Sequence, residues 1–284
     1  MAEGDAGRIE DAYADEILTA DEQADHEAEI ETGADDSEAA LEGVPPVLSI
    51  IFGAPYALGE GFLAYREAAD GGEPWDAVLE DPPSAEELLD PSAWGTERSE
   101  VGDVDVEAPE GTEVLDESTF DPLTWYLLLA SRSDPATALE TVDGWGGDAY
   151  VAYRRDDGVV CAALAVTGDE PADVDAFQTA LEVWAGSAPT GTTTVERHDD
   201  RVEVHACDPG TEADATGAVT EELLALPYLR ADMEAQIISS GATEDQARCA
   251  SRATFEVATL EQLTATTADP ALQQEVAEAV MGCA

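Results

Sequence analysis

Carboxylates and histidines are the side chains in this sequence that could carry out acid–base chemistry. The 284-residue chain contains 65 Asp and Glu residues, so a pair suited to proton transfer can be drawn almost anywhere and no single pair stands out. His198 and His205 lie close together in "TTTVERHDDRVEVHACDPG" and could face a ligand, although histidines on the polar face of a hairpin are more often solvated. HExxH, GxSxG and phosphate-loop motifs are all absent from the sequence. We therefore predict no catalytic residue in this chain.

The segment "GWGGD" at residues 144–148 is rich in glycine, as phosphate-binding loops are. A phosphate loop needs a strand before it and a helix after it, and the flanking sequence predicts neither. We interpret the segment as a tight turn that lets Trp145 pack.

Four cysteines remain, and their spacing favours disulfides over a metal site. Cys161, Cys207, Cys249 and Cys283 include no CxxC pair, and the chain has three histidines in all, which disfavours a Cys/His zinc site. We predict a Cys161–Cys207 bond that joins two hairpins of one sheet, and a Cys249–Cys283 bond within the C-terminal helices. Strand alternation puts Cys207 on the polar face, so its bond is expected to face solvent or lie at the sheet edge.

An even number of widely spaced cysteines indicates an oxidising compartment, so we expect an extracellular or cell-envelope location. The first residues lack the basic and apolar regions of a signal peptide. They read instead as the middle of an amphipathic helix, with apolar residues at spacings of three and four. We expect that a leading segment is missing from this chain.

The charge of the chain excludes several classes of partner. The formal net charge is −54, with 11 basic residues against the 65 acidic ones, and all 11 are Arg. Nucleic acids and anionic membranes bind clustered positive charge, which this sequence lacks. Adaptation to high salt and solubility in low salt could both explain the acidity. The spread of acids along the whole chain favours the first. A protein or peptide partner and a monomeric state are expected.

The helices and strands predicted from the sequence indicate an α+β fold. Two β-rich hairpins flank a helix, and this β-β-α-β-β order implies a small antiparallel sheet with a helix on one side. We predict four segments: a mainly helical part at 1–95, a polar linker or edge strand plus loop at 96–112, the sheet unit at 113–212, and a helical module at 213–284.

Local signals place several helix ends. Ser84 and Glu87 form the pattern of a capping box, while Gly241 and Thr243 mark a helix end and the next helix start. The apolar stretch "VPPVLSIIFGAPYALGEGFLAY" is interrupted by Pro, Gly and Glu. We interpret it as one or two buried helices, too short and too broken for a membrane span.

Several short motifs resemble a family of bacterial, actinobacterial-type, secreted zinc-metallopeptidase-like proteins of the gluzincin kind. They are "AEGDA", "PYALGEGFLAY", "PPSAEELLDPSAW", "GWGGDAYVAYR" and the cysteine-bearing "EDQARCA" with the final "GC". In that family an HExxH helix comes first, and a later helix carries an EGxA segment whose Glu is the third zinc ligand. The resemblance thus implies that residues 1–95 are the remnant of a metallopeptidase-like domain.

The resemblance implies one site residue in this chain, Glu3. It would be the third zinc ligand, but the two histidine ligands that precede it in the family are not in this sequence. One carboxylate cannot hold catalytic zinc, which needs three protein ligands, and His26, His198 and His205 lack the spacing to replace the missing histidines. Zinc is therefore expected in a full-length relative, and no cofactor in this chain. Two functions of different class follow: the inactive C-terminal portion of a metallopeptidase-like protein, or a non-enzymatic, secreted α+β interaction module.

Overall fold

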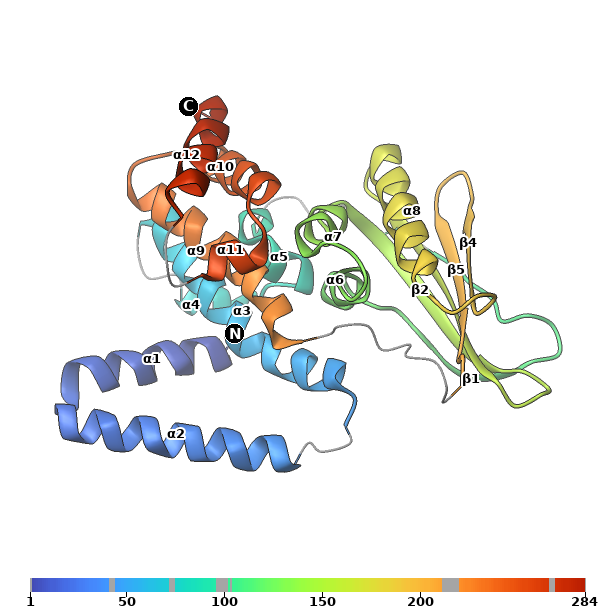
Figure 1. Ribbon diagram of the computed structural model, residues 1–284, viewed down its shortest axis with the longest axis horizontal. Coiled ribbons are helices and arrows are strands. Elements are labelled where there is room, and N and C mark those ends of the chain that lie inside the picture. The colour runs from blue at the N-terminus through green and yellow to red at the C-terminus, as the bar shows by residue number, and fades with distance from the viewer. Residues whose placement is uncertain are drawn as a thin grey trace. The chain divides into compact units, whose positions relative to one another are not determined.

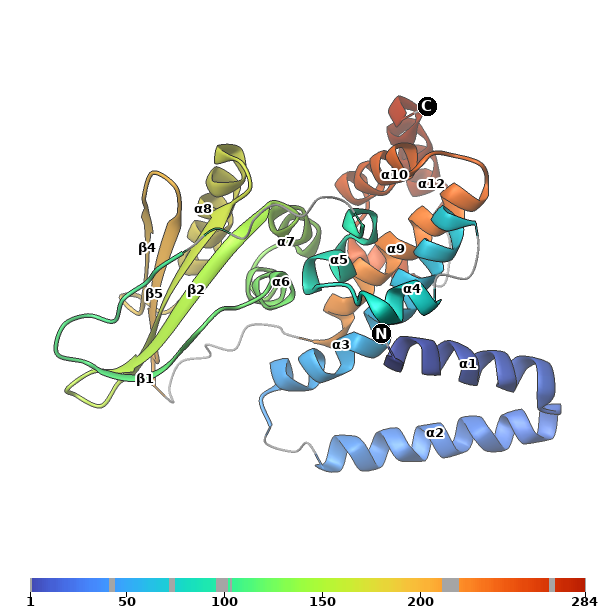
Figure 2. The same ribbon diagram turned by 180° about the vertical axis from the view of Figure 1, so that it is seen from behind.

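The computed structural model describes residues 2–40, 44–71, 75–95, 102, 104–210, 220–265 and 269–283. These residues fold into helices and one five-stranded antiparallel sheet, which confirms the α+β class (Figures 1 and 2). The chain forms two compact units, one made of Met1–Pro83 with Thr220–Arg248 and the other of Ser84–Val219 with Cys249–Ala284.

The first unit is built from helices around a long central one. The central helix α3 packs against both α1 and α9, as both views show (Figures 1 and 2). The hydroxyl of Tyr65 on α3 donates to Glu244 at 2.9 Å, at the start of α10. The elements of this unit are α1 (Ala2–Ile17), α2 (Ala20–Ala40), α3 (Pro46–Asp70), α4 (Trp75–Glu80), the 3₁₀ turn η2 (Glu221–Leu224), α9 (Ala225–Ser239) and the first residues of α10 (Glu244–Val257).

The N-terminal region, which belongs to the mainly helical part predicted at 1–95, begins with two helices. The break follows α1 at Leu18–Thr19, where the Thr19 backbone N–H and hydroxyl both bond to the Glu22 carboxylate, at 2.9 and 2.7 Å. This pairing resembles a capping box and starts α2. For residues 32–43 the sequence predicts a hinge followed by a short helical piece, whereas the chain is helical without a break as far as Ala40, and residues 41–43 lie outside the described part.

Helix α3 differs from the expectation of a short, broken apolar stretch. It is one helix of 25 residues that contains Pro55 and ends at Gly71, whose φ of 69° is the left-handed conformation favoured by glycine. Its length and composition would allow it to cross a membrane, and 39% of its most apolar window is buried. A core helix of a soluble protein passes the same test. Packing on α1 and α9 offsets the hydrogen bond that Pro55 removes.

Helices α1 and α3 approach closely where two glycines face each other. A Cβ added at Gly4 would lie 2.5 Å from the carbonyl carbon of Gly59, a distance that real side chains do not reach. Gly7, one turn further along α1, has open space at the same position. The absence of a side chain at Gly4 is therefore what allows the two backbones to touch.

We predict that Gly4→Ala lowers the free energy of unfolding of the first unit by about 1–3 kcal/mol, since overpacking forces the helices apart. Gly7→Ala, the matched control, should raise it by about 0.5–1 kcal/mol through better helix propensity. Denaturant unfolding measures both, and hydrogen exchange of the α1 amides locates the effect. Equal effects of the two substitutions would contradict the close approach.

The second unit contains the sheet, whose strand order is β1-β2-β3-β5-β4 with every neighbouring pair antiparallel. The expected β-β-α-β-β order is confirmed, and β1 adds an edge strand. The elements are α5 (Ala85–Leu89), η1 (Pro91–Ala93), β1 (Glu113–Ser118), α6 (Pro122–Ala130), α7 (Pro135–Val142), β2 (Trp145–Arg154), β3 (Val160–Gly168), α8 (Pro171–Gly186), β4 (Thr193–Arg197), β5 (Val202–Cys207), the rest of α10, α11 (Leu260–Thr264), α12 (Pro270–Val280) and η3 (Met281–Cys283). The Ser84–Glu87 capping box of α5 is present as predicted.

One face of the sheet packs against α8, which lies beside β3, β4 and β5 (Figure 1). Alternation along β5 turns Val202 and Val204 to this face, where both are buried. From α8, Phe177 is fully buried and meets the ring of Trp125 edge-on, with 6.1 Å between the ring centroids. These aromatic contacts join the α8 layer to α6.

The opposite face of the sheet, which the sequence predicts to be polar and solvent-exposed around Cys207, carries an apolar cluster. Val151, Tyr153, Cys161 and Ala163 are buried together, and Val106 and Ala108 from the segment before β1 pack against them. Cys207 also contacts this cluster. The expectation of a solvent-facing disulfide was therefore wrong on the Cys161 side, because a non-helical segment covers part of this face.

Both predicted disulfides are present. Cys161 and Cys207 are direct cross-strand partners, and Asp208 N–H donates to Val160 O beside them. That bond makes them a non-hydrogen-bonded pair, the position where facing side chains approach most closely. Cys249 and Cys283 join α10 to η3 with 5.6 Å between their Cα atoms. By the chain-entropy model, loops of 46 and 34 residues each contribute about 4 kcal/mol.

Candidate functional site

The hairpin formed by β4 and β5 holds an unusual share of the chain's scarce basic residues. Arg197, His198, Arg201 and His205 lie within nine positions, although the whole chain has 11 Arg and three His. This hairpin is thus the place where a strongly acidic protein can build charge-paired contacts.

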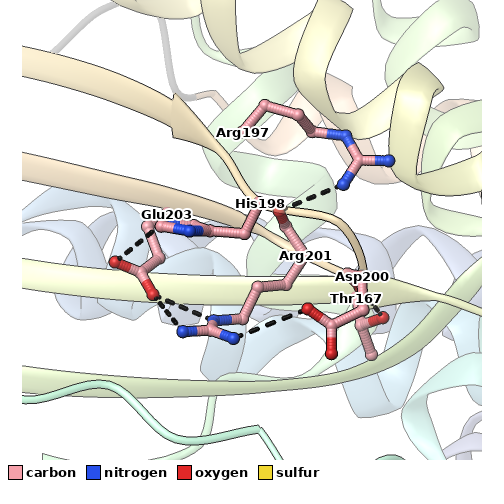
Figure 3. Close-up of polar contacts among 6 residues, drawn as sticks. All are labelled: Thr167, Arg197, His198, Asp200, Arg201 and Glu203. Atoms are coloured by element: carbon pink, nitrogen blue, oxygen red, sulfur yellow. Dashed lines mark hydrogen bonds and ion pairs between the residues drawn. The ribbon is translucent and has the colours of Figure 1, made fainter.

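Glu203 on β5 is the centre of this cluster (Figure 3). Its Oε1 accepts a hydrogen bond from Nε of Arg201 at 2.9 Å and forms an ion pair with the terminal nitrogen Nη2 at 2.7 Å. Its Oε2 lies 3.4 Å from Nε2 of His198. Nε2 of His198 is buried and forms no hydrogen bond with any described residue, so it contacts Glu203 without a hydrogen bond. One carboxylate thereby lies against two basic side chains.

The backbone turn beside this carboxylate is also fixed by polar contacts. His198 N–H donates to Arg201 O at 2.9 Å and closes the turn. The Thr167 hydroxyl, at the end of β3, donates to Asp200 O at 2.5 Å. The guanidinium of Arg197 donates to Arg201 O at 3.4 Å, as Figure 3 shows, and to Asp175 of α8 at 3.2 Å. The cluster therefore ties the hairpin to β3 on one side and to α8 on the other.

The chemistry available in this cluster is that of ion pairing. Each of the two arginines has a carboxylate partner, and the Thr167 hydroxyl already donates to a carbonyl. His205 lies opposite Ala163 and Thr194 in the sheet register. The two histidines singled out by the sequence thus occupy different surroundings, and the contacts of the cluster position the hairpin.

We predict opposite effects for two neighbouring carboxylates of the hairpin. Glu196 on β4 lies directly opposite Glu203, where like charges repel. Glu203→Gln should lower the free energy of unfolding by about 1 kcal/mol, because Arg201 loses its counter-charge. Glu196→Gln, the matched control, should leave it unchanged or raise it. Denaturant unfolding at low salt measures both, and a larger loss for Glu196→Gln would refute the assignment.

A second polar group, Asp148, is buried near the start of β2. The side chain is 4% exposed. Its Oδ1 accepts from the Phe120 backbone N–H at 2.6 Å, and its Oδ2 accepts from Trp145 Nε1 at 2.8 Å. Burial raises the pKa of Asp148, and the two hydrogen bonds oppose that shift. The indole N–H of Trp125 also lowers the pKa of Asp148, although its position does not satisfy the geometry of a hydrogen bond.

This arrangement corrects the interpretation of "GWGGD" as a turn. Trp145 begins β2, and a register irregularity separates it from Gly147. A Cβ at Gly146 would lie 2.7 Å from the carbonyl carbon of Gly168, so glycine allows the ends of β2 and β3 to touch. Asp148, which sequence reasoning did not single out, links this corner to Phe120, two residues before α6 begins. An acidic residue inside an otherwise apolar strand was the signal available.

We predict a pH dependence of stability that belongs to Asp148. Below the ordinary aspartate pKa of 3.8 the carboxyl is neutral in both states. As pH rises above that value the unfolded state releases the proton first, so stability falls until the pH passes the folded-state pKa. Asp148→Asn removes this titration. The free energy of unfolding of wild type minus that of D148N should decrease across this window and then level off, and a flat difference would contradict the prediction.

The remaining residues named from the sequence do not assemble into a metal centre. Glu3 lies in α1, and its side chain is outside the described part. His26 on α2 lies 3.5 Å from Glu10 of α1. Within the described residues, no three His, Cys, Asp or Glu side chains are grouped so as to hold a metal ion.

Comparison with known proteins finds one family for part of the chain. Residues 92–222 match a family described as a domain of unknown function, DUF8575. The match includes all five strands, Asp148, the Glu203 cluster and the Cys161–Cys207 bond. No curated protein and no solved structure matches the chain significantly.

Proposed function

We propose that this chain is a non-enzymatic interaction module that works outside the cytoplasm and binds a protein partner through the helices of its first unit. The proposal develops the interaction-module hypothesis from the sequence. It rests on exposed apolar side chains that the fold leaves uncovered, and the two disulfides support the location.

The observation that carries the proposal is the position of large apolar side chains on α1 and α3. Leu48, Phe52 and Tyr56 follow one another at intervals of four on α3, and the last two are 73% and 60% exposed. Such spacing places them on one helix face. A second exposed set on α1 has the same spacing, namely Ile9, Tyr13 and Ile17. Exposed apolar side chains grouped in this way mark interaction sites in soluble proteins.

The compartment follows from the cysteines. All four are paired in two disulfides. Bonds of this kind persist in oxidising compartments and are rare in a reducing cytosol. The pairing is compatible with an extracellular location, and we propose that the module is secreted or lies at the cell envelope.

The resemblance to zinc metallopeptidases contributes less to the proposal. It supplies Glu3 alone, and the described residues bring no second and third ligand together. Catalytic zinc requires three protein ligands. The donor set does not fit the metal, and we derive no catalytic step from it.

A site-specific photo-crosslinker tests the interaction in the organism that encodes the chain. Placed at Phe52, it should yield a discrete adduct with another protein in the extracellular or envelope fraction. Placed at Val183, which is 52% exposed on α8 of the other unit, it should yield none. Equal crosslinking from both positions, or none from Phe52, would overturn the proposal. Mass spectrometry without reductant should find both disulfides intact.

A further inference from the structure

An apolar groove runs along α3 beside the exposed aromatic residues. Residues of α3 form one wall, and residues of η2 and α9, which pack on α3, form the other. The groove has a volume of about 350 Å³. Ser49, Gly53 and Ala57 line it from α3, with Leu224 and Tyr228 opposite. All of them belong to the first unit.

Gly53 leaves the space that makes this groove. A Cβ built at Gly53 would meet no atom within 4 Å, although the residue lies inside a helix. Ile50 and Leu224, exposed by 1% and 5%, form its buried floor. Phe52 and Tyr56 lie beside it on α3 and are mostly exposed. A large apolar side chain from a partner would therefore find a hole at Gly53 and aromatic surface next to it.

The charges around the groove select the partner. Its described lining residues are uncharged, while acidic residues lie at both ends of the η2–α9 wall, with Asp232 one turn beyond Tyr228 and Glu222 within η2. Two arginines lie on the same helices: Arg230 on α9 is 3% exposed, and Arg66 on α3 is paired with Asp70 at 2.6 Å. A segment that complements this surface has apolar residues in the middle and basic residues about one turn away on each side.

We propose that this groove binds an amphipathic, cationic helix of a partner protein, which inserts one large apolar side chain at Gly53. The proposal rests on the proposed function, since it names the partner of the same helical surface. Two helices already form the walls, so a third helix laid between them completes ridges-into-grooves packing. A second copy of this chain is disfavoured as the occupant, because each copy carries a formal charge of −54.

The test uses a synthetic helical peptide of about 15 residues with Leu at intervals of three and four and Lys elsewhere. A second peptide replaces every Lys by Glu. Binding is measured by fluorescence anisotropy at about 0.15 M salt. The Lys peptide should bind the full chain and the Glu peptide should not. Gly53→Leu fills the groove and should weaken binding of the Lys peptide by about tenfold or more.

Gly33→Leu is the matched control, because Gly33 also lies inside a helix and also has no atom within 4 Å of a built Cβ. It should leave the affinity unchanged. Both variants should melt at or above the wild-type temperature, since glycine is a poor helix former. Equal affinity of wild type and Gly53→Leu for the Lys peptide would show general charge attraction and overturn the proposal.

Two other outcomes would assign the groove differently and also overturn it. Self-association in sedimentation that Gly53→Leu abolishes would make a second copy the occupant. Binding to phosphatidylcholine vesicles that Gly53→Leu abolishes would make it a lipid surface. Crosslinks from Phe52 that persist in the Gly53→Leu variant would leave the interaction module standing while this groove assignment fails.

Discussion

The contact between α3 and α9 is the interaction on which the first unit depends. The two helices are far apart in the sequence, yet they pack closely, and Gly61 of α3 lies against Tyr228 and Ala231 of α9. Leu58 and Phe62, on the same helix as Gly61, are 2% and 0% exposed. The groove at Gly53 exists for the same reason, because its second wall comes from η2 and α9.

The strong negative charge shapes how both units bury apolar surface. In the second unit the sheet has a helix-covered face, and the other face is closed in part by Val106 and Ala108 around Cys161. The polar part of that sheet is stabilised by pairing, since Glu203 serves two basic side chains of the hairpin. A few carboxylates, such as Asp148, Glu87 and Glu234, are buried, and salt screens the repulsion among the exposed ones. The apolar side chains left exposed on α1 and α3 stand out against this pattern.

Local features of the fold were predictable from the sequence, and long-range ones were not. The Ser84–Glu87 capping box, the two hairpins and both disulfide pairings follow from neighbours in sequence or from simple alternation. The Thr19–Glu22 pair was equally visible and was missed. In contrast, the addition of β1 to the sheet and the packing of α9 on α3 depend on partners chosen from the whole chain. Asp148 shows the same limit at the candidate site. Its buried carboxylate accepts hydrogen bonds from Phe120 and Trp145, and the contact with Phe120 joins segments that are distant in the sequence.

In the sequence, the sheet-bearing segment Ser84–Val219 of the second unit lies between the two segments of the first unit, and Cys249–Ala284 of the second unit follows them. The chain leaves the first unit after Pro83 and rejoins it at Thr220, and the DUF8575 match at 92–222 falls almost entirely within that interval. During synthesis from the N-terminus, the strands and the Cys161–Cys207 pair are complete before α9 has been made. The side of α3 that packs on α9 therefore stays uncovered while the residues of the whole sheet are translated. A nascent chain of this design needs either rapid closure once α9 emerges or a protective factor bound to α3 until then.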